Sequence, residues 1–137
     1  MRPDVHIAYP VPANPVARGV VDELIAHHPN ITLIESRDYL HIVYLLEAAY
    51  LILADSGDTP KEALSMGKPV LVMRDVTERP EVVDAGTIKL VGTDAEHIMR
   101  ECTMFLDDPS YYRAFSNHLS PHGGGQASQR IVEILLR

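Results

Sequence analysis

The chain has 137 residues, and its 46% hydrophobic and 23% charged composition is that of a globular domain long enough to enclose a core. A formal net charge of −7 argues against nucleic acid or an anionic membrane surface as the main partner. No apolar run approaches the ~20 residues of a membrane span, the N-terminal stretch lacks a secretion-signal pattern, and the single cysteine, Cys102, fits a reducing compartment. We therefore expect one cytoplasmic domain over residues 1–137.

Five short apolar runs alternate with helical patterns along the chain. Their hydrophobicity is continuous rather than alternating, which is typical of strands that are buried on both faces of a parallel sheet. The strands are expected at 5–9, 31–36, 51–56, 69–75 and 87–92.

The segments between the strands carry helical periodicity. In the first of them Val16, Val20, Val21, Leu24 and Ile25 fall on one helical face. Repeated strand–helix units with right-handed crossovers predict an α/β fold, a doubly wound, Rossmann-like and mostly parallel sheet of about five strands with C-terminal helices. The helices are expected at 16–28, 39–50, 60–67, 80–86, 95–108, 110–119 and 126–137.

In such sheets, ligands bind at the loops that follow the carboxyl ends of the strands. One of these loops, ADSGDTP (54–60), leads into a short helix. The free N–H groups and the positive dipole end of that helix would favour a diphosphate beside Ser56 and Gly57. Further along, Glu62 offers two acceptor oxygens to the hydroxyls of a ribose, and the planar fork of Arg79 suits phosphate or sugar oxygens.

Each of these residues also has a purely structural interpretation. Ser56 is equally explained as a helix cap, whereas a glutamate such as Glu62 is more often part of a solvated helix face. An arginine in the place of Arg79 is more often a surface residue, here with Glu81 as a partner. The residues alone leave the two interpretations open.

Several longer motifs carry a family resemblance. The Asp-Ser-Gly turn with the E-A-x-S-x-G-K-P-V pattern that follows it, RDVTERPE (74–81) and AGTIKLVGTD (85–94) resemble the C-terminal half of non-hydrolysing UDP-N-acetylglucosamine 2-epimerases. ITLIESRDY (31–39) and GGGQASQRIVE (123–133) fit the same family. That family has two Rossmann-like domains in a GT-B-like arrangement, with the nucleotide sugar between them. The resemblance implies that this chain corresponds to the second, UDP-binding domain.

The resemblance also implies a substrate-binding site. The family uses a Glu at the position of Glu62 to bind the ribose, and an aromatic residue faces the uracil where Ile42 stands here. Thr77 and Glu78 share the loop of Arg79, and the glycines near the C-terminus let the backbone approach the ligand. The expected substrate-binding residues are Ser56, Gly57, Glu62, Arg79, Thr77, Glu78, Ile42, Gly123 and Gly125, with no catalytic residue, cofactor or metal in this half.

The sequence departs from the family at several of these points. Pro12 replaces a histidine that is thought to contribute to the active site, and Ile42 offers no face for stacking. Asp58 follows Gly57 and would repel a diphosphate at ~4–6 Å, an effect that Lys61 offsets in part. Pro60 removes one N–H donor.

These departures lead to two hypotheses. The first is the UDP-binding half of an epimerase, which binds UDP or UDP-N-acetylglucosamine weakly and is inactive without a separate N-terminal catalytic domain. The alternative is a non-catalytic, diverged nucleotide-binding or interaction domain.

Other chemistry finds little support in the sequence. His27 and His28 are adjacent and would splay apart on a helix, while the spacing of His118 and His122 is interrupted by proline and glycine. Cys102 lies on an apolar helical face with Met99 and Leu106, which predicts a packed core thiol. Tyr111 and Tyr112 are expected to take part in helix packing.

Overall fold

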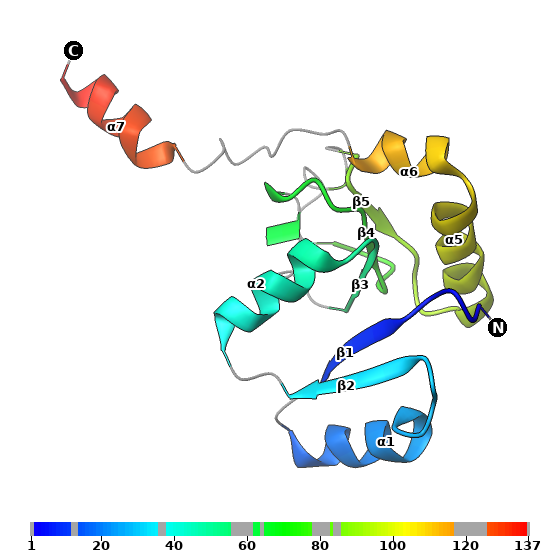
Figure 1. Ribbon diagram of the computed structural model, residues 1–137. Coiled ribbons are helices and arrows are strands. Elements are labelled where there is room, and N and C mark those ends of the chain that lie inside the picture. Colours follow the sequence, from blue (N-terminus) through cyan, green and yellow to red (C-terminus); the bar gives the residue numbers. More distant parts are fainter. Residues whose placement is uncertain are drawn as a thin grey trace. The chain divides into compact units, whose positions relative to one another are not determined.

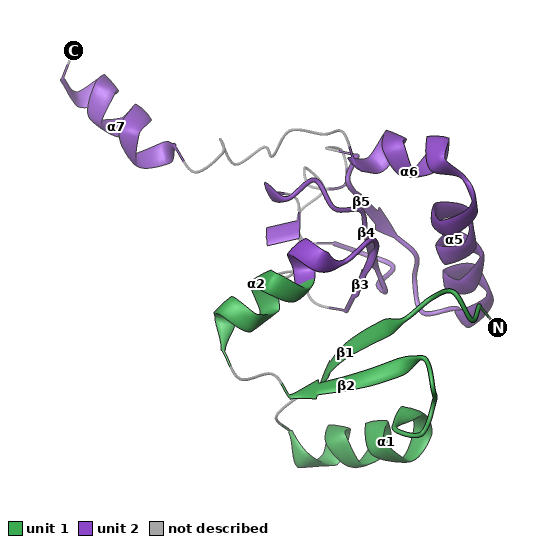
Figure 2. Cartoon of the chain, in the orientation of Figure 1, with its two compact units in different colours: residues 1–45 green, residues 46–137 purple. Residues whose placement is uncertain are grey.

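The computed structural model describes residues 2–11, 14–35, 38–55, 62–63, 65–77, 83, 86–116 and 126–136. The chain divides into two compact units, residues 1–45 and 46–137 (Figure 2). The described residues form five strands and five helices (Figure 1).

Unit 1 is built on a parallel pair of strands that are connected by one helix. In chain order it contains β1 (Ile7–Val11), α1 (Pro15–Ile25), β2 (Ile31–Glu35) and the beginning of α2 (Tyr39–Ala48), which continues into unit 2. The strands pair in register from Ile7 opposite Ile31 to Val11 opposite Glu35. Asn14 caps α1, because its side chain accepts a 3.0 Å hydrogen bond from the Val16 N–H, and Pro15 fits the first helical position.

Unit 2 contains a three-stranded parallel sheet with β4 in the middle. All three residues of β4 are buried, as expected for a central strand that is paired on both edges. The elements are β3 (Ile52–Ala54), β4 (Val70–Val72), β5 (Ile88–Leu90), α5 (Ala95–Asp107), α6 (Pro109–Ser116) and α7 (Ala127–Leu135).

The core of unit 2 forms where α5 and α6 pack on each other beside the sheet (Figure 1). Leu71, Val91 and Phe105 are completely or almost completely buried there. The Phe105 ring meets the Tyr111 ring edge-on at 4.8 Å between centroids. Cys102 and Tyr112 pack against the same cluster, so the predicted core thiol and the predicted tyrosine packing are confirmed. Burial raises the pKa of the Cys102 thiol.

The predicted fold class is confirmed: the fold is α/β and every described strand pairing is parallel. β1 has the expected five residues but begins two residues later, and the other four strands are shorter than expected. They form one sheet of two strands and one sheet of three. Of the helix predicted at 60–67, residues 60, 61 and 64 lie outside the described residues, and Glu62, Ala63 and Ser65 have helical backbone. Of the helix predicted at 80–86, only Val83, which is helical, and Gly86 are described. No helix in the described part of the chain is long and apolar enough to cross a membrane.

Two details of the predicted burial are wrong. The apolar face of α1 is not buried as a whole: Val16 is 79% exposed, while Val21 and Ile25 are half-buried. A helix touches a two-stranded sheet through a narrow stripe, so apolar residues about 100° away around the helix stay outside it. On α5, Met99 is 70% exposed, so the apolar face predicted around Cys102 is narrower than expected.

Candidate functional site

The carboxyl ends of the strands in unit 2 meet at one edge of the sheet, and hydrogen bonds extend the pairing beyond them. Met73 N–H donates to the Ala54 carbonyl at 2.8 Å, which ties the end of β4 to the end of β3. Val91 N–H donates to the Val72 carbonyl at 2.9 Å, and Gly92 N–H to the Arg74 carbonyl at 3.1 Å. The loops after β4 and β5 are therefore held side by side where this fold class binds its ligands.

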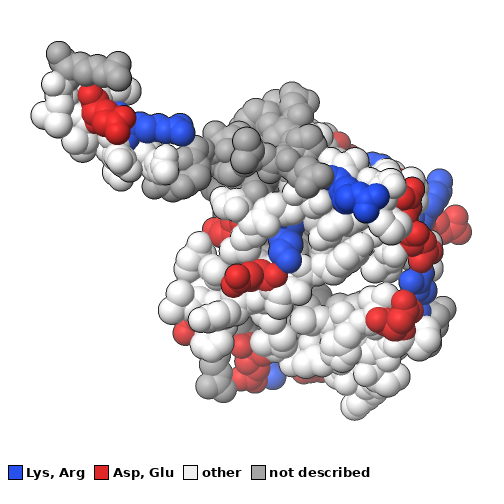
Figure 3. Space-filling view, turned by 45° about the horizontal axis from the view of Figure 1, so that its top comes forward, with Lys and Arg blue, Asp and Glu red and all other residues white. Residues whose placement is uncertain are grey.

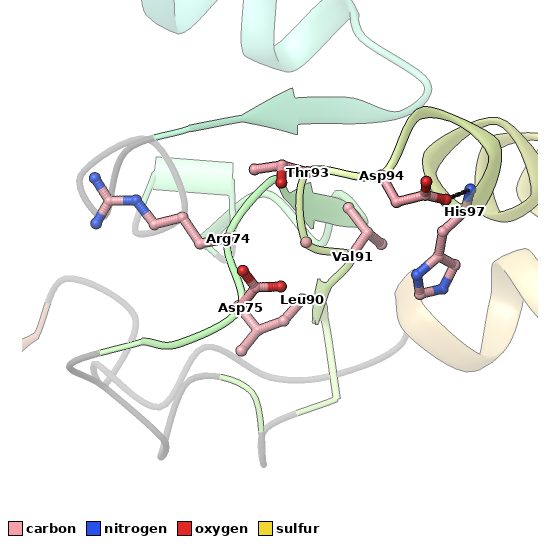
Figure 4. Close-up of a pocket in the computed structure, with 8 residues that line it drawn as sticks. Arg74, Asp75, Leu90, Val91, Thr93, Asp94 and His97 are labelled. Atoms are coloured by element: carbon pink, nitrogen blue, oxygen red, sulfur yellow. Dashed lines mark hydrogen bonds between the residues drawn. The ribbon is translucent and has the colours of Figure 1, made fainter.

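A hollow of about 310 Å³ lies at this edge (Figure 4). Asp94 caps α5 there, since its carboxylate accepts a 2.7 Å hydrogen bond from the His97 N–H. In Figure 4 the Arg74 guanidinium extends away from Asp94 and His97, so the charged groups do not converge on one point. The lining residues are Arg74, Asp75, Leu90, Val91, Gly92, Thr93, Asp94 and His97.

A partly buried polar cluster adjoins the hollow through His97, one of its lining residues. The Nε2 atom of His97 is 3.5 Å from one oxygen of Glu101, and the other oxygen accepts hydrogen bonds from Lys89 Nζ at 2.7 Å and the Tyr111 hydroxyl at 3.0 Å. Burial raises the pKa of Glu101, but the hydrogen bonds from Lys89 and Tyr111 outweigh it and hold the pKa below its usual value. The charged carboxylate thus ties α5 to β5 and α6.

The sequence pattern does not reveal this cluster. The one signal was Lys89 itself, a charge inside the apolar run of β5. Glu101 on α5 looked like any exposed helical acid, and only the tertiary packing brings the two together.

Two of the predicted substrate-binding residues in unit 2 are described. Glu62 lies in helical backbone after β3, and Thr77 lies in the segment after β4; both are half-buried. Because β3 and β4 are hydrogen-bonded parallel neighbours, both residues follow carboxyl ends at the same edge of the sheet.

The remaining predictions are distributed between unit 1 and the residues that are not described. Ile42 is a half-buried residue of α2 in unit 1. Directly before that helix, Asp38 accepts a hydrogen bond from the His41 backbone N–H at 3.1 Å and pairs with His41 Nδ1 at 2.7 Å, and these two interactions lower the pKa of Asp38. Ser56, Gly57, Glu78, Arg79, Gly123 and Gly125 lie outside the described residues, as do Pro12, Asp58, Pro60 and Lys61.

The surface charge offers no strong attraction for a polyanion. Figure 3 shows basic and acidic side chains interspersed over the face that it presents, in keeping with the net charge of −7. Within the described part of the chain, no group of three or more His, Cys, Asp or Glu side chains is arranged to hold a metal ion.

Comparison with known proteins gives extensive matches. A family model described as UDP-N-acetylglucosamine 2-epimerase matches residues 1–136. The UDP-N-acetylglucosamine 2-epimerase of Escherichia coli (strain K12) is 51% identical over 132 residues, which make up 96% of this chain and 35% of that protein. The chain thus spans about a third of the length of the curated relatives it matches.

Solved structures agree with the sequence matches. A crystal structure of UDP-GlcNAc 2-epimerase from Neisseria meningitidis bound to UDP-GlcNAc has a TM-score of 0.87 at 45% identity, over 96% of this chain and 36% of that one. A crystal structure of the UDP-GlcNAc 2-epimerase from Methanocaldococcus jannaschii, in complex with UDP-GlcNAc and UDP, has a TM-score of 0.74 at 31% identity. The match covers 97% of this chain and 36% of that one. The structure of a glycotransferase of kitacinnamycin has a TM-score of 0.66 at 21% identity, over 96% of this chain and 35% of that one. At this identity the match shows a similar fold and nothing more.

Proposed function

Because the chain belongs to the UDP-N-acetylglucosamine 2-epimerase family, we propose that it is the UDP-binding half of an enzyme that interconverts UDP-GlcNAc and UDP-N-acetylmannosamine. One observation carries the proposal: 96% of the chain matches a structure bound to UDP-GlcNAc at 45% identity. The substrate, the reaction and the need for an N-terminal partner domain are all part of this proposal.

We place the nucleotide sugar at the carboxyl edge of the three-stranded sheet of unit 2. Ser56 and Gly57 hold the diphosphate at a helix N-terminus, and Glu62 accepts hydrogen bonds from the ribose. Arg79 binds phosphate or sugar oxygens. The position of Glu62 and Thr77 after neighbouring parallel strands supports this assignment. Thr77 and Glu78 line the sugar side, Ile42 contacts the uracil, and Gly123 and Gly125 let the backbone approach the ligand.

The reaction itself needs groups that this half does not supply. By the family's chemistry, the C2 proton is removed, UDP is eliminated to give 2-acetamidoglucal, and UDP adds back after protonation of the other face. A positioned acid and base must carry these proton transfers. Pro12 stands at the position where the family has a histidine, so we assign the acid–base residues to the N-terminal domain.

A second candidate is a non-catalytic nucleotide-binding or interaction domain. The specific observations in its favour are Asp58 beside the expected diphosphate and Pro12 in place of the histidine. Both candidates place the chain in the cytoplasm, an assignment supported by its single cysteine, which permits no internal disulfide.

Titration of the chain with UDP tests the proposal. We expect weak binding that Arg79→Ala reduces further, because the substitution removes the guanidinium fork. We expect Asp58→Gly combined with Ile42→Phe to strengthen binding, because the pair removes a repelling charge and restores a stacking ring. Unchanged affinity in Arg79→Ala would contradict the site, and unchanged affinity in the double variant would contradict the account of the departures.

A further inference from the structure

The side chain of His41, in the first turn of α2, is tied to Asp38, the residue directly before that helix. One carboxylate oxygen of Asp38, Oδ1, lies 2.7 Å from His41 Nδ1 and also accepts the His41 backbone N–H at 3.1 Å. Because Asp38 precedes His41 by three residues, the contact between the side chains directs the imidazole toward the N-terminal end of α2. That end follows the carboxyl end of β2, the edge at which this fold class binds its ligands.

The carboxylate decides which ring nitrogen of His41 carries a hydrogen. The two hydrogen bonds from His41 hold the pKa of Asp38 below its usual value, so Asp38 is ionised at neutral pH. An ionised carboxylate can only accept hydrogen bonds, and Nδ1 must therefore be the donor. In the neutral imidazole, Nε2 then carries no hydrogen and is an acceptor.

This acceptor nitrogen is open to a ligand. The His41 side chain is 62% exposed, and within the described part of the chain Nε2 has no hydrogen bond or ion pair. The two ring nitrogens point in different directions, so Nε2 faces away from Asp38. The next residue along the chain is the half-buried Ile42, which the proposed function places against the uracil. A base that contacts Ile42 lies at the same helical turn as His41.

Uracil and cytosine differ in the hydrogen bonds that their ring edges offer. Uracil N3 carries a hydrogen and donates, whereas cytosine N3 carries none and accepts. An acceptor at Nε2 of His41 pairs with uracil N3–H, but it would face a second acceptor in cytosine, and a polar group left without its partner is costly. Ile42 gives contact area to either base and cannot make this distinction, because an apolar side chain forms no hydrogen bond.

We propose that His41 is a base-specificity residue of the nucleotide site: its Nε2 atom accepts a hydrogen bond from N3–H of uracil, and Asp38 holds the imidazole in the tautomer that allows this. Asp38 is a positioning residue that acts through His41. The inference rests on the proposed function, which supplies the uracil nucleotide and its contact with Ile42, and it adds the group that selects uracil over cytosine.

Three variants separate this role from the stability of α2. His41→Ala removes the imidazole but keeps the backbone N–H that Asp38 accepts, so the helix stays capped. Asp38→Ser keeps an oxygen at the capping position but removes the carboxylate that fixes the tautomer. His6→Ala is the matched control, since His6 also belongs to unit 1 and its Nε2 lies 2.7 Å from Thr32 Oγ1. His6 directly precedes β1, so it lies at the opposite, amino edge of the strands.

The experiment titrates the ¹⁵N-labelled chain and its variants with UDP and, separately, with CDP, at about pH 8, where an ordinary imidazole is neutral. Shifts of the backbone amide resonances give the two affinities. We expect the wild-type chain to bind UDP about tenfold more tightly than CDP. His41→Ala should lose most of this preference, because UDP binding weakens while CDP binding does not. His6→Ala should keep the preference of the wild type.

Long-range ¹H–¹⁵N spectra of the imidazole test the role of Asp38 before any nucleotide is added. In the wild-type chain Nδ1 of His41 should carry the hydrogen and Nε2 should not, and UDP but not CDP should then shift the Nε2 resonance. In Asp38→Ser the second tautomer should appear, and the preference for UDP should fall severalfold. Loss of a helix cap alone would not change the tautomer.

The possible failures are distinguishable. Equal affinity of the wild-type chain for UDP and CDP, or an unchanged preference in His41→Ala, would overturn the proposal while leaving UDP binding, and with it the proposed function, intact. A hydrogen on Nε2 in the free wild-type chain would overturn the assignment of the acceptor. A wild-type chain that binds neither nucleotide would contradict the proposed function and the base contact together.

Discussion

Lys89 Nζ lies 2.7 Å from Glu101 Oε2, and the Tyr111 hydroxyl lies 2.8 Å from the ammonium and 3.0 Å from the carboxylate. The side chain of Glu101 is 8% exposed and that of Lys89 is 32% exposed. Burial opposes both charges, and it lowers the pKa of Lys89, but the hydrogen bonds to Glu101 and Tyr111 outweigh it and leave that pKa raised. Three elements, β5, α5 and α6, are joined by this triangle.

We expect Glu101→Ala to destabilise the protein by about 1–3 kcal/mol, because it leaves a partly buried ammonium without its counter-ion. The measurement is the free energy of unfolding in urea. Asp4→Ala is the control, since the Arg2–Asp4 pair has a similar separation of 2.9 Å but is exposed on both sides. A loss in Glu101→Ala no larger than in Asp4→Ala would contradict a stabilising role.

The same cluster predicts a pH dependence. Burial alone would raise the pKa of Glu101, but its hydrogen bonds lower it below the ordinary value of 4.5, so its ionised form stabilises the fold above that pH and the contribution is lost as pH falls through the folded pKa. Lys89, with a raised pKa, contributes below 10.5 and loses its contribution above. The stability difference between wild type and Glu101→Gln should therefore be constant near neutral pH and shrink at acid pH. Unfolding curves at pH 7 and pH 3 that give equal differences would refute this.

Phe105 is the most deeply embedded ring of unit 2. It is fully buried and meets the rings of Tyr111 and Phe115 at 4.8 and 5.0 Å between centroids. Phe105→Ala should cost about 3–5 kcal/mol through the lost burial and the cavity it leaves. Met99→Ala, on the exposed side of the same helix, should change the free energy of unfolding by less than about 0.5 kcal/mol. Similar losses in both variants would mean that the cavity at Phe105 collapses.

Local patterns predict the regular elements of this chain well. The apolar run around β4 predicts a strand buried on both faces, and Val70, Leu71 and Val72 are all buried. The family resemblance read from RDVTERPE and AGTIKLVGTD is confirmed by the match over residues 1–136. The substrate-binding residues remain predictions, with Glu62 and Thr77 placed after neighbouring strands.

Relationships between distant residues are what the sequence does not reveal. Lys89 and Glu101 are 12 residues apart and meet only because α5 packs back on β5. Asp75 and Gly92 belong to loops after different strands, so the approach of the Asp75 carboxylate to Gly92 is visible only in the folded chain. The exposure of Val16 on α1 is also set by tertiary structure. Sequence periodicity identifies the apolar face of a helix, but it does not show how much of that face other elements cover.

We expect the 137-residue chain alone not to epimerise UDP-GlcNAc at a useful rate. Proton transfer at C2 needs a positioned acid and base, each typically worth ~10²–10⁴-fold, and Pro12 can neither donate nor accept a proton there. One Rossmann-like half also leaves the sugar open to water, without a second wall to orient it. In the proposed site the diphosphate and ribose contacts come from this half, so the chain alone should bind the nucleotide without turning it over.

NMR of UDP-GlcNAc incubated with the purified chain in heavy water tests whether a chain that binds the nucleotide also turns it over. A preparation of the chain that binds UDP should give no UDP-N-acetylmannosamine, and no more deuterium at C2 than a protein-free control. Epimerase activity should appear only when the N-terminal domain of a relative is added. The Escherichia coli enzyme, 51% identical over the matched residues, is a suitable source of that domain. A Pro12→His variant is the matched comparison, and it should raise activity only in the presence of that domain. The restored histidine supplies neither the second acid–base group nor the protein surface that encloses and orients the sugar. Deuterium at C2 with the unmodified chain alone would show that this half carries its own acid–base residues.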